Sequence, residues 1–270
     1  MGPPGFMFRT MRRFACLALI ATLACSREPV QWGATVYASV PREPLEFPGG
    51  LQSVPSADAC PGSLRVAKNG SHQYAAWWES KPDSSVVLLF SRMSGRVWSA
   101  SIVADSTDEG ARGCGRPAPA IAADDSSGYI HLAYFSEPES GAGIFFAHSM
   151  DSGATFHSPV PIVFGRNPSR VSVASDGDRV AVAYEDPNAS QPLIGIALSR
   201  TMGHIFESRI QGTSESGRAR QPVVRIEGDS IRLWWSEYSS DPAVSATRPR
   251  YRAGQWKGPG AANRQGEETK

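Results

Sequence analysis

Arginines and carboxylates recur at corresponding places along this chain of 270 residues. The arginines lie in the segments "GCGRPAP", "FGRNPSR" and "SGRARQP", each leading into an apolar run, and are Arg116, Arg166, Arg170, Arg218 and Arg220. A second set follows aromatic runs, in "YFSEPES", "YEDPN" and "WWSEYSSD", and consists of Glu137, Glu185, Glu237 and Tyr238. Guanidinium groups bind carboxylates and sulfates through paired hydrogen bonds, and glycoside hydrolysis needs positioned carboxyl groups. If the fold gathers them, these side chains predict an anion site or glycoside chemistry.

The same residues allow a simpler interpretation. Arginines and glutamates at the ends of loops often pair with one another in water, and such pairs contribute little to stability. The choice between a site and surface pairs depends on the elements that carry these side chains.

A turn motif shows how those elements are organised. The stretch "SMDSGATF" places Ser149, Asp151, Gly153 and Phe156 at fixed intervals. Degenerate copies follow the same frame 58 residues earlier and 50 residues later, as Ser91, Gly95, Trp98 and as Ser199, Gly203, Phe206. Glycine can adopt a positive φ, and Ser or Asp side chains can bind nearby backbone N–H groups. The motif therefore predicts a repeated turn pinned by an aromatic residue.

Short apolar runs flank each turn. The runs "YAAWWES", "YIHLAYFSE", "VAVAYED" and "IRLWWSE" align an aromatic column at Trp77, Tyr134, Tyr184 and Trp235, about every 50 residues. Runs of this length, bounded by Gly, Asp and Pro, are typical of strands, and no convincing helix is expected after residue 30. Four-stranded units at this period predict an all-β fold, a β-propeller of about four to five four-stranded blades with such turns.

The frame Ser-x-Asp-x-Gly-x-x-aromatic resembles the Asp-box (BNR) motif of sialidase-type β-propellers. The resemblance covers roughly residues 61 to 258. It implies that the box is a structural turn between third and fourth strands. It also implies that the functional face carries the loops into each first strand and out of each second strand, where the arginines and acids above lie. Sialidases have six blades, so this chain is short for an intact one.

The resemblance does not extend to catalytic residues. Sialidases carry an Arg-Ile-Pro type motif early in the chain, and the nearest segment here, "VPREPLEF" around Arg42, does not match. We therefore expect a non-catalytic protein that binds a carbohydrate, an anionic ligand or a protein. The alternatives are a diverged sialidase-type glycoside hydrolase and a scaffold without a small-molecule site.

The N-terminus indicates export. In "MRRFACLALIATLAC" two arginines precede an apolar run of about eleven residues, too short to span a bilayer stably but typical of a signal peptide. Residues 1–25 are expected to form this signal, and "TLACS" resembles a bacterial lipobox that would lipidate Cys25. The expected location is the bacterial cell envelope, with the membrane reached only through the anchor. An ordinary secretion signal is the alternative.

The rest of the chain divides into a linker with a closing strand at 26–60, a propeller at 61–260 and a disordered tail at 261–270. The segment "VQWGATVYAS" could supply an outer strand to the last repeat, in which "YRAGQW" is interpreted as a shortened turn. Cys60 and Cys114 precede the innermost strands of consecutive repeats, so a disulfide is expected in an oxidising compartment. Two free thiols are the alternative.

Composition excludes some functions. The chain has 27 basic and 26 acidic residues, which argues against a nucleic-acid binder that would need a basic face. The five histidines show no metal-ligand spacing, and no glycine-rich phosphate loop is present. The acidic segments "ADSTDEG" and "ASDGD" are interpreted as turns. No metal and no cofactor are expected.

Overall fold

The computed structural model describes residues 2, 28–39, 41, 56–70, 72–95, 97–124, 127–214, 218–239 and 247–257. Apart from residue 2, the expected signal peptide with Cys25 lies outside the described residues, as does the expected tail at 261–270. The described residues contain no helix. It follows that none of them forms a helix long and apolar enough to cross a membrane.

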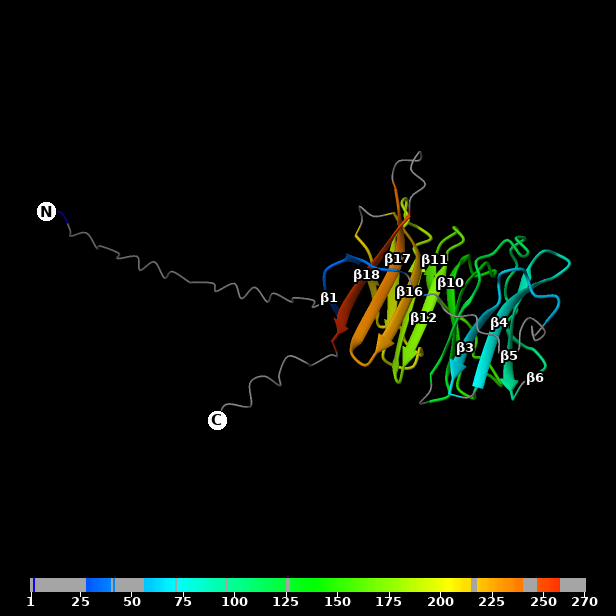
Figure 1. The fold of residues 1–270 in the computed structure, drawn as a ribbon. Coiled ribbons are helices and arrows are strands. Elements are labelled where there is room, and N and C mark those ends of the chain that lie inside the picture. Colours follow the sequence, from blue (N-terminus) through cyan, green and yellow to red (C-terminus); the bar gives the residue numbers. More distant parts are fainter. Residues whose placement is uncertain are drawn as a thin grey trace.

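The strands form four antiparallel sheets (Figure 1). The first sheet contains β3 (Arg65–Asn69), β4 (His72–Ser80), β5 (Val86–Ser94) and β6 (Val97–Trp98), with β7 (Ile102–Asp105) also paired to β5. The second contains β8 (Ala120–Ala123), β9 (Ile130–Ser136), β10 (Gly143–Ser149) and β11 (Val160–Phe164). The third contains β12 (Val171–Asp176), β13 (Arg179–Glu185), β14 (Ile194–Ser199) and β15 (Ser208–Gln211). The fourth contains β16 (Arg218–Glu227), β17 (Ser230–Tyr238) and β18 (Thr247–Trp256), and β18 also pairs with β1 (Val30–Trp32) and β2 (Val36–Tyr37).

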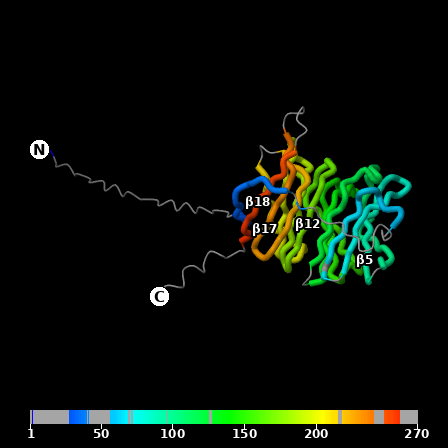
Figure 2. Tube along the Cα trace, in the orientation of Figure 1, coloured from blue at the N-terminus to red at the C-terminus, as the bar shows by residue number. Residues whose placement is uncertain are grey.

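This architecture confirms the expected all-β propeller with four recognisable repeats. Sheet-to-sheet packing in the described part of the chain runs in sequence order, from β3 to β8, from β8 to β12 and from β12 to β16. The first and fourth sheets form the two ends of this series (Figure 2). Because all four inner strands line one hollow, the series curves around a common axis.

The aromatic column fixes the packing between sheets. Tyr134, Tyr184 and Trp235 are buried, and each joins a hydrophobic cluster shared with the preceding sheet. Trp77 occupies the matching place in the first sheet and packs with Ala75 and Leu89 in a cluster of residues from that sheet and the segment leading into it. Large buried rings dominate such interfaces, because each removes a large apolar area from water. The repeated column therefore sets how consecutive blades stack.

The turn at Ser149 has the hydrogen bonds that its sequence predicts. The Ser149 hydroxyl accepts from the backbone N–H of Gly153 (2.8 Å) and donates to Asp151 (2.7 Å). The Asp151 carboxylate also accepts from the N–H and the hydroxyl of Thr155, at 2.9 and 2.7 Å. These bonds hold the pKa of Asp151 at about 2. A fully bonded carboxylate thus closes this exposed turn.

The aromatic residue of the motif packs on the preceding blade. Phe156 meets Phe90 edge to face at 5.0 Å between ring centroids, and Phe206 meets Phe146 at 4.9 Å. The turn at Ser199 repeats the geometry with Thr201 in the aspartate place, since the Thr201 hydroxyl accepts from the N–H of Ile205 at 2.9 Å. Each turn therefore joins two blades.

The first degenerate copy, at Ser91, does not form this turn. β5 continues through Ser94, and Met93 and Ser94 pair directly with Trp98 and Val97 in a tight hairpin. The Ser91 hydroxyl instead donates to the backbone oxygen of Ser99 at 2.8 Å. The turn predicted at Ser91 is wrong, because β5 extends three residues beyond this serine before the chain reverses direction.

The N-terminal segment supplies the outer edge of the fourth sheet. Val30 pairs with Trp256 and Trp32 with Gly254, so β1 adds to β18. The segment "YRAGQW", interpreted from sequence as a turn, lies inside β18. Pairing on both sides explains this difference, because β18 binds β17 along one edge and β1 and β2 along the other. The N-terminal pairing covers an edge that would otherwise expose unpaired backbone groups.

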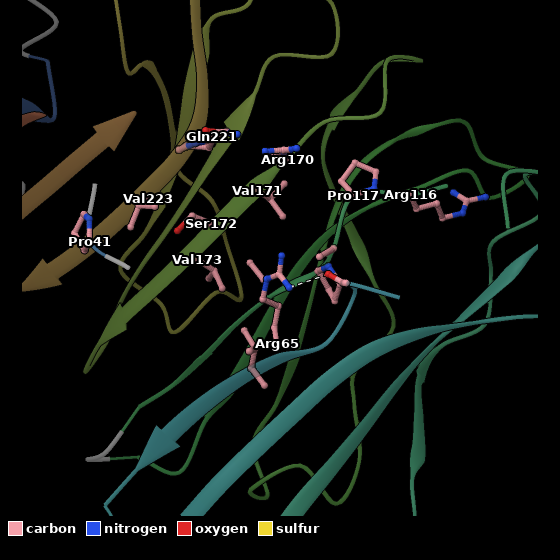
Figure 3. Close-up of a pocket in the computed structure, with 16 residues that line it drawn as sticks. Pro41, Arg65, Arg116, Pro117, Arg170, Val171, Ser172, Val173, Gln221 and Val223 are labelled. Atoms are coloured by element: carbon pink, nitrogen blue, oxygen red, sulfur yellow. Dashed lines mark hydrogen bonds between the residues drawn. The ribbon is translucent and has the colours of Figure 1, made fainter. Parts of the chain in front are cut away.

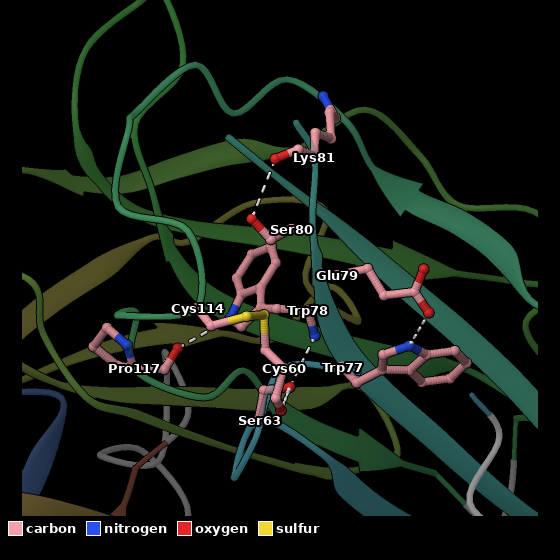
Figure 4. The surroundings of a disulfide bond; sticks show 9 residues. All are labelled: Cys60, Ser63, Trp77, Trp78, Glu79, Ser80, Lys81, Cys114 and Pro117. Carbon is pink, nitrogen blue, oxygen red and sulfur yellow. Dashed lines mark hydrogen bonds between the residues drawn. A yellow bond between two sulfur atoms is a disulfide. The ribbon is translucent and has the colours of Figure 1, made fainter. Parts of the chain in front are cut away.

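Cys60 and Cys114 form a disulfide that links the first sheet to the loop leading into the second (Figure 4). Their Cα atoms are 5.2 Å apart, and 54 residues separate them in sequence. Cys60 N–H donates to the carbonyl of Trp78 (2.7 Å), and the Trp78 indole donates to the carbonyl of Pro117 (3.0 Å). The bridge and Trp78 together fix the Arg116–Pro117 segment beside the axis.

Candidate functional site

The four inner strands surround a cavity of about 480 Å³ at one end of the axis (Figure 3). Its lining comes from every blade and comprises residues 62, 65, 116–121, 170–173 and 221–223, with Pro41 from the N-terminal segment. The residues leading into each inner strand therefore converge, as the resemblance to propellers implied.

Register explains which side chains meet there. Arg65, Ala120, Ser172 and Val223 occupy equivalent places, because each pairs with the residue that precedes the aromatic column in its second strand. Ala120, Ser172 and Val223 have short side chains, so they leave space beside the axis. Arg65 is the exception and introduces a cation into the wall.

A β-bulge shapes the wall of the fourth blade. The register of β16 shifts between Arg220 and Val223, and Gln221 has φ of +57°. Glu185 of the third blade accepts a hydrogen bond from the Gln221 N–H at 2.9 Å. Positive φ in a residue other than glycine is uncommon and often marks a functional site. Here the bulge holds Gln221 against the cavity.

The charged residues that line the cavity are Arg65, Arg116 and Arg170, and the described lining includes no aspartate or glutamate. Arg170 is exposed, and Arg65 is half-buried and donates to the carbonyls of Gly62 and Leu64. An anion entering this cavity would meet the exposed Arg170, whereas the Arg65 guanidinium already donates to backbone carbonyls.

Arg116 borders the cavity, but its guanidinium is directed away from it (Figure 3). The side chain is fully buried, with Nη2 2.7 Å from Asp108 Oδ1 and Nη1 3.3 Å from Glu137 Oε2. Burial lowers the pKa of Arg116, although the charges of Asp108 and Glu137 oppose this effect. A buried pair of this kind is costly to break. Arg116 is therefore placed as a structural residue and not as a ligand-binding one.

Asp108 is the centre of this buried network. Its carboxylate accepts from the N–H of Glu137 (2.9 Å), the hydroxyl of Ser136 (3.2 Å) and the N–H of Gly110 (3.2 Å). The sequence interpretation treated its acidic segment as an ordinary turn. Only the fold shows that this turn enters the interface between the first two blades.

The remaining predicted residues do not join the cavity. Arg166, Arg218, Arg220, Glu137, Glu185, Glu237 and Tyr238 lie outside its described lining. Arg220 stacks over Tyr238 at 5.9 Å, and Glu237 pairs with Arg250. Glu185 accepts from the backbone N–H groups of Arg170 and Gln221, at 3.4 and 2.9 Å. Of the five arginines expected to gather at one site, Arg116 and Arg170 border the cavity, and only Arg170 does so with an exposed side chain.

Three polar side chains of the lining were not predicted from the sequence: Arg65, Ser172 and Gln221. Arg65 could have been found in "SLRVA" by aligning the inner runs on the aromatic column. Gln221 could not have been found in this way, because its position depends on a β-bulge that no local sequence pattern predicts.

The described residues contain no group of three or more His, Cys, Asp or Glu arranged to hold a metal ion. Four histidines do gather at the interface of the second and third blades. His148 lies 4.6 Å, between ring centroids, from both His157 and His204. His131 is fully buried nearby, and burial holds its pKa at about 3.

No family model matches the chain, and no curated protein matches it. Solved structures similar in fold include the NanB sialidase of Streptococcus pneumoniae, at 15% identity and a TM-score of 0.46, covering 73% of this chain and 30% of that one. A neuraminidase-like protein from A/bat/Guatemala has 10% identity and a TM-score of 0.49, covering 82% and 57%. A GH43_12 protein retrieved from capybara gut metagenome has 11% identity and a TM-score of 0.43, covering 74% and 40%. The chain thus spans less than two thirds of each of these structures.

Proposed function

We propose that this chain is a non-catalytic binding protein whose axial cavity takes an anionic ligand, of the class of acidic sugars. The observation that carries the proposal is Arg170, an exposed arginine in the wall of a cavity whose described lining holds no carboxylate. Guanidinium binds carboxylates and sulfates with two directed hydrogen bonds. Under this proposal the turns at Ser149 and Ser199 are Asp-box turns with a structural role.

The arrangement of carboxylates favours binding over glycoside hydrolysis. A hydrolase of the two-carboxylate type needs two carboxyl groups on either side of the scissile bond. Glu137 faces Arg116, Glu237 pairs with Arg250, and Glu185 accepts from backbone N–H groups of its own blade and of the next one. These three carboxylates are therefore engaged in ion pairs or hydrogen bonds that stabilise the fold.

The proposal includes export and lipid anchoring at Cys25. The Cys60–Cys114 disulfide supports export, because such bonds persist in oxidising compartments. Replacing Cys25 by alanine should move the protein from the membrane fraction to the soluble fraction after cell lysis. An unchanged distribution would exclude the anchor.

Thermal melting tests the binding site. Sialic acid, uronic acids, sulfated sugars and simple anions are added in turn, and a ligand that binds the folded state raises the melting temperature by mass action. The rise should disappear in Arg170→Ala and persist in Arg166→Ala, an exposed arginine outside the cavity lining. If no anion shifts the melting temperature at moderate salt, the protein is better described as a scaffold without a small-molecule site.

A further inference from the structure

Gln221 lies beside Arg170 in the wall of the axial cavity, although the two residues belong to different blades (Figure 3). Glu185, at the end of β13, holds them together. One oxygen of its carboxylate accepts from the N–H of Arg170 (3.4 Å), and the other accepts from the N–H of Gln221 (2.9 Å). Because both oxygens belong to one carboxylate, the two backbone positions are neighbours. Glu185 itself lies outside the described lining of the cavity.

The side-chain amide of Gln221 uses its oxygen within the protein. Oε1 accepts from the hydroxyl of Ser236 at 3.0 Å. A glutamine amide also carries an NH2 group with two donors, and within the described part of the chain Nε2 donates to no protein group. The contact with Ser236 therefore fixes the amide while its N–H donors remain available to a ligand.

Ser172 adds a second neutral donor to the same wall. Its hydroxyl oxygen accepts from the N–H of Val224 at 3.1 Å, and no described group accepts its proton. A hydroxyl can donate one hydrogen bond while it accepts others. The wall thus offers the charged donors of Arg170 and the neutral donors of Gln221 and Ser172, whereas the described lining contains no aspartate or glutamate.

This set of donors favours a ligand rich in acceptors over a bare anion. A guanidinium group binds a carboxylate through paired hydrogen bonds, and a simple anion held in this way leaves the neutral donors unused. In a uronic acid, the ring oxygen is bonded to the carbon that carries the carboxylate. Such a molecule presents a charged and a neutral acceptor next to each other.

We propose that the axial cavity selects carboxylates with an ether or hydroxyl oxygen on the adjacent carbon, with Arg170 binding the carboxylate and Gln221 donating to that oxygen. This inference rests on the proposed function and narrows its ligand to one class of acid. Glu185 and Ser236 are positioning residues, since the first sets the backbone of both donors and the second orients the amide. The φ of +57° at Gln221 is consistent with this role, because residues other than glycine adopt such angles rarely and often at ligand sites.

Two small acids that differ by a single oxygen test the proposal. In tetrahydropyran-2-carboxylate the ring oxygen adjoins the carbon that carries the carboxylate, and in cyclohexanecarboxylate a CH2 group takes its place. Titrations followed by NMR give a dissociation constant for each. The unmodified protein should bind the ether acid about three- to tenfold more tightly, as expected for one neutral hydrogen bond. Gln221→Leu should remove this preference by weakening the ether acid alone, whereas Arg170→Ala should weaken both acids.

Ser236→Ala provides a second test in which the backbone of Gln221 is unchanged, because leucine resists a positive φ. This variant should reduce the preference, since the amide loses its fixed orientation. If Gln221→Leu does not fold, the result for Ser236→Ala decides. Ser158→Ala is the matched control, at an exposed serine outside the described lining, and should retain the full preference.

The outcomes separate this inference from the function on which it rests. Equal affinities of the unmodified protein for the two acids, tighter binding of cyclohexanecarboxylate, or a preference that persists without the Gln221 amide would overturn the inference and leave the proposed anion site intact. Absence of binding of both acids and of galacturonate would overturn the two together.

Discussion

At the scale of single residues, the turn glycines show how backbone and packing requirements combine. Gly153 has φ of +85°, and a Cβ placed on it would lie 2.2 Å from the ring of Phe90 in the preceding blade. Gly95 has φ of +66°, but a Cβ there would meet nothing within 4 Å. Both positions favour glycine for its backbone. Only Gly153 also lacks room for a side chain.

Replacing each glycine by alanine separates these effects. Gly153→Ala should lower the free energy of unfolding by about 1–3 kcal/mol more than Gly95→Ala, because the methyl group must displace Phe90. Asp151→Ala should cost less than Gly153→Ala, about 1 kcal/mol, since exposed turn hydrogen bonds are lost. Denaturant unfolding of the three variants measures the order. Equal losses for the two glycine variants would show that Phe90 does not constrain the turn.

The buried histidines predict a loss of stability in acid. Burial holds the pKa of His131 at about 3 and that of His148 at about 4, both below the ordinary value of 6.5. His157 and His204 face His148 and further lower the pKa of His148. Asp124 has the opposite effect on His131, because its negative charge favours the protonated imidazole. The unfolded chain therefore takes up protons between pH 6.5 and 4 that the folded protein does not. The contribution of these neutral histidines to the free energy of unfolding is complete above pH 6.5 and decreases as the pH falls toward 4.

The variant His131→Leu tests this dependence. Its free energy of unfolding should decline less between neutral pH and pH 4.5 than that of the unmodified protein, by about 2 kcal/mol. His72→Leu, at an exposed position in β4, should leave the decline unchanged. Parallel curves for His131→Leu and the unmodified protein would mean that His131 does not remain neutral in the folded state.

At the scale of elements, the disulfide adds a covalent link to the packing and hydrogen bonds that join the first two blades. It closes a loop across 54 residues of sequence, for which the chain-entropy model gives about 4 kcal/mol. The double variant Cys60→Ala, Cys114→Ala should therefore lose about 2–4 kcal/mol of stability. Reductant should lower the stability of the unmodified protein to a similar level and have no effect on the double variant. An unmodified protein that is indifferent to reductant would contradict a structural role for the bond.

Sequence periodicity was sufficient to predict most elements. The column from Trp77 to Trp235 identified the second strand of every blade, because a buried interface demands the same large residue at each repeat. The turns at Ser149 and Ser199 were predictable, since their hydrogen bonds are local. The turn near Ser91 was not, because the extension of β5 depends on pairing with β4 and β6 and not on the motif itself.

The site was less predictable than the fold. Arg116 and Arg170 occupy similar places in their segments, yet one is buried against Asp108 and the other faces the cavity. The difference arises from the contact with Asp108, which lies eight residues earlier in the loop between β7 and β8 and also bonds to Ser136 and Glu137 of the second blade. Gln221 lines the cavity because of a β-bulge, and its N–H donates to Glu185 of the third blade. Interactions between repeats cannot be seen in the pattern of one repeat.

At the scale of the whole molecule, four blades arranged about one axis bring residues from separate parts of the chain to the wall of one cavity, where Arg170 is exposed. The acids that sequence analysis placed near them are engaged elsewhere, in the Asp108–Arg116 network, at Arg250 and at the backbone of the fourth blade. The exposed charge of Arg170 is therefore the central feature of the proposed binding site.

The most direct test is a calorimetric titration of a galacturonate oligosaccharide into three proteins: the unmodified chain, Arg170→Glu and Arg166→Glu. The two variants change the net charge equally, and both arginines are exposed in neighbouring positions. An ionic strength of about 0.05 M keeps screening weak. We expect binding to the unmodified protein and to Arg166→Glu with affinities within about threefold, and no detectable binding to Arg170→Glu, because a carboxylate would then face the anion. Equal binding to all three proteins, or to none, would contradict the assignment of the axial cavity as an anion site.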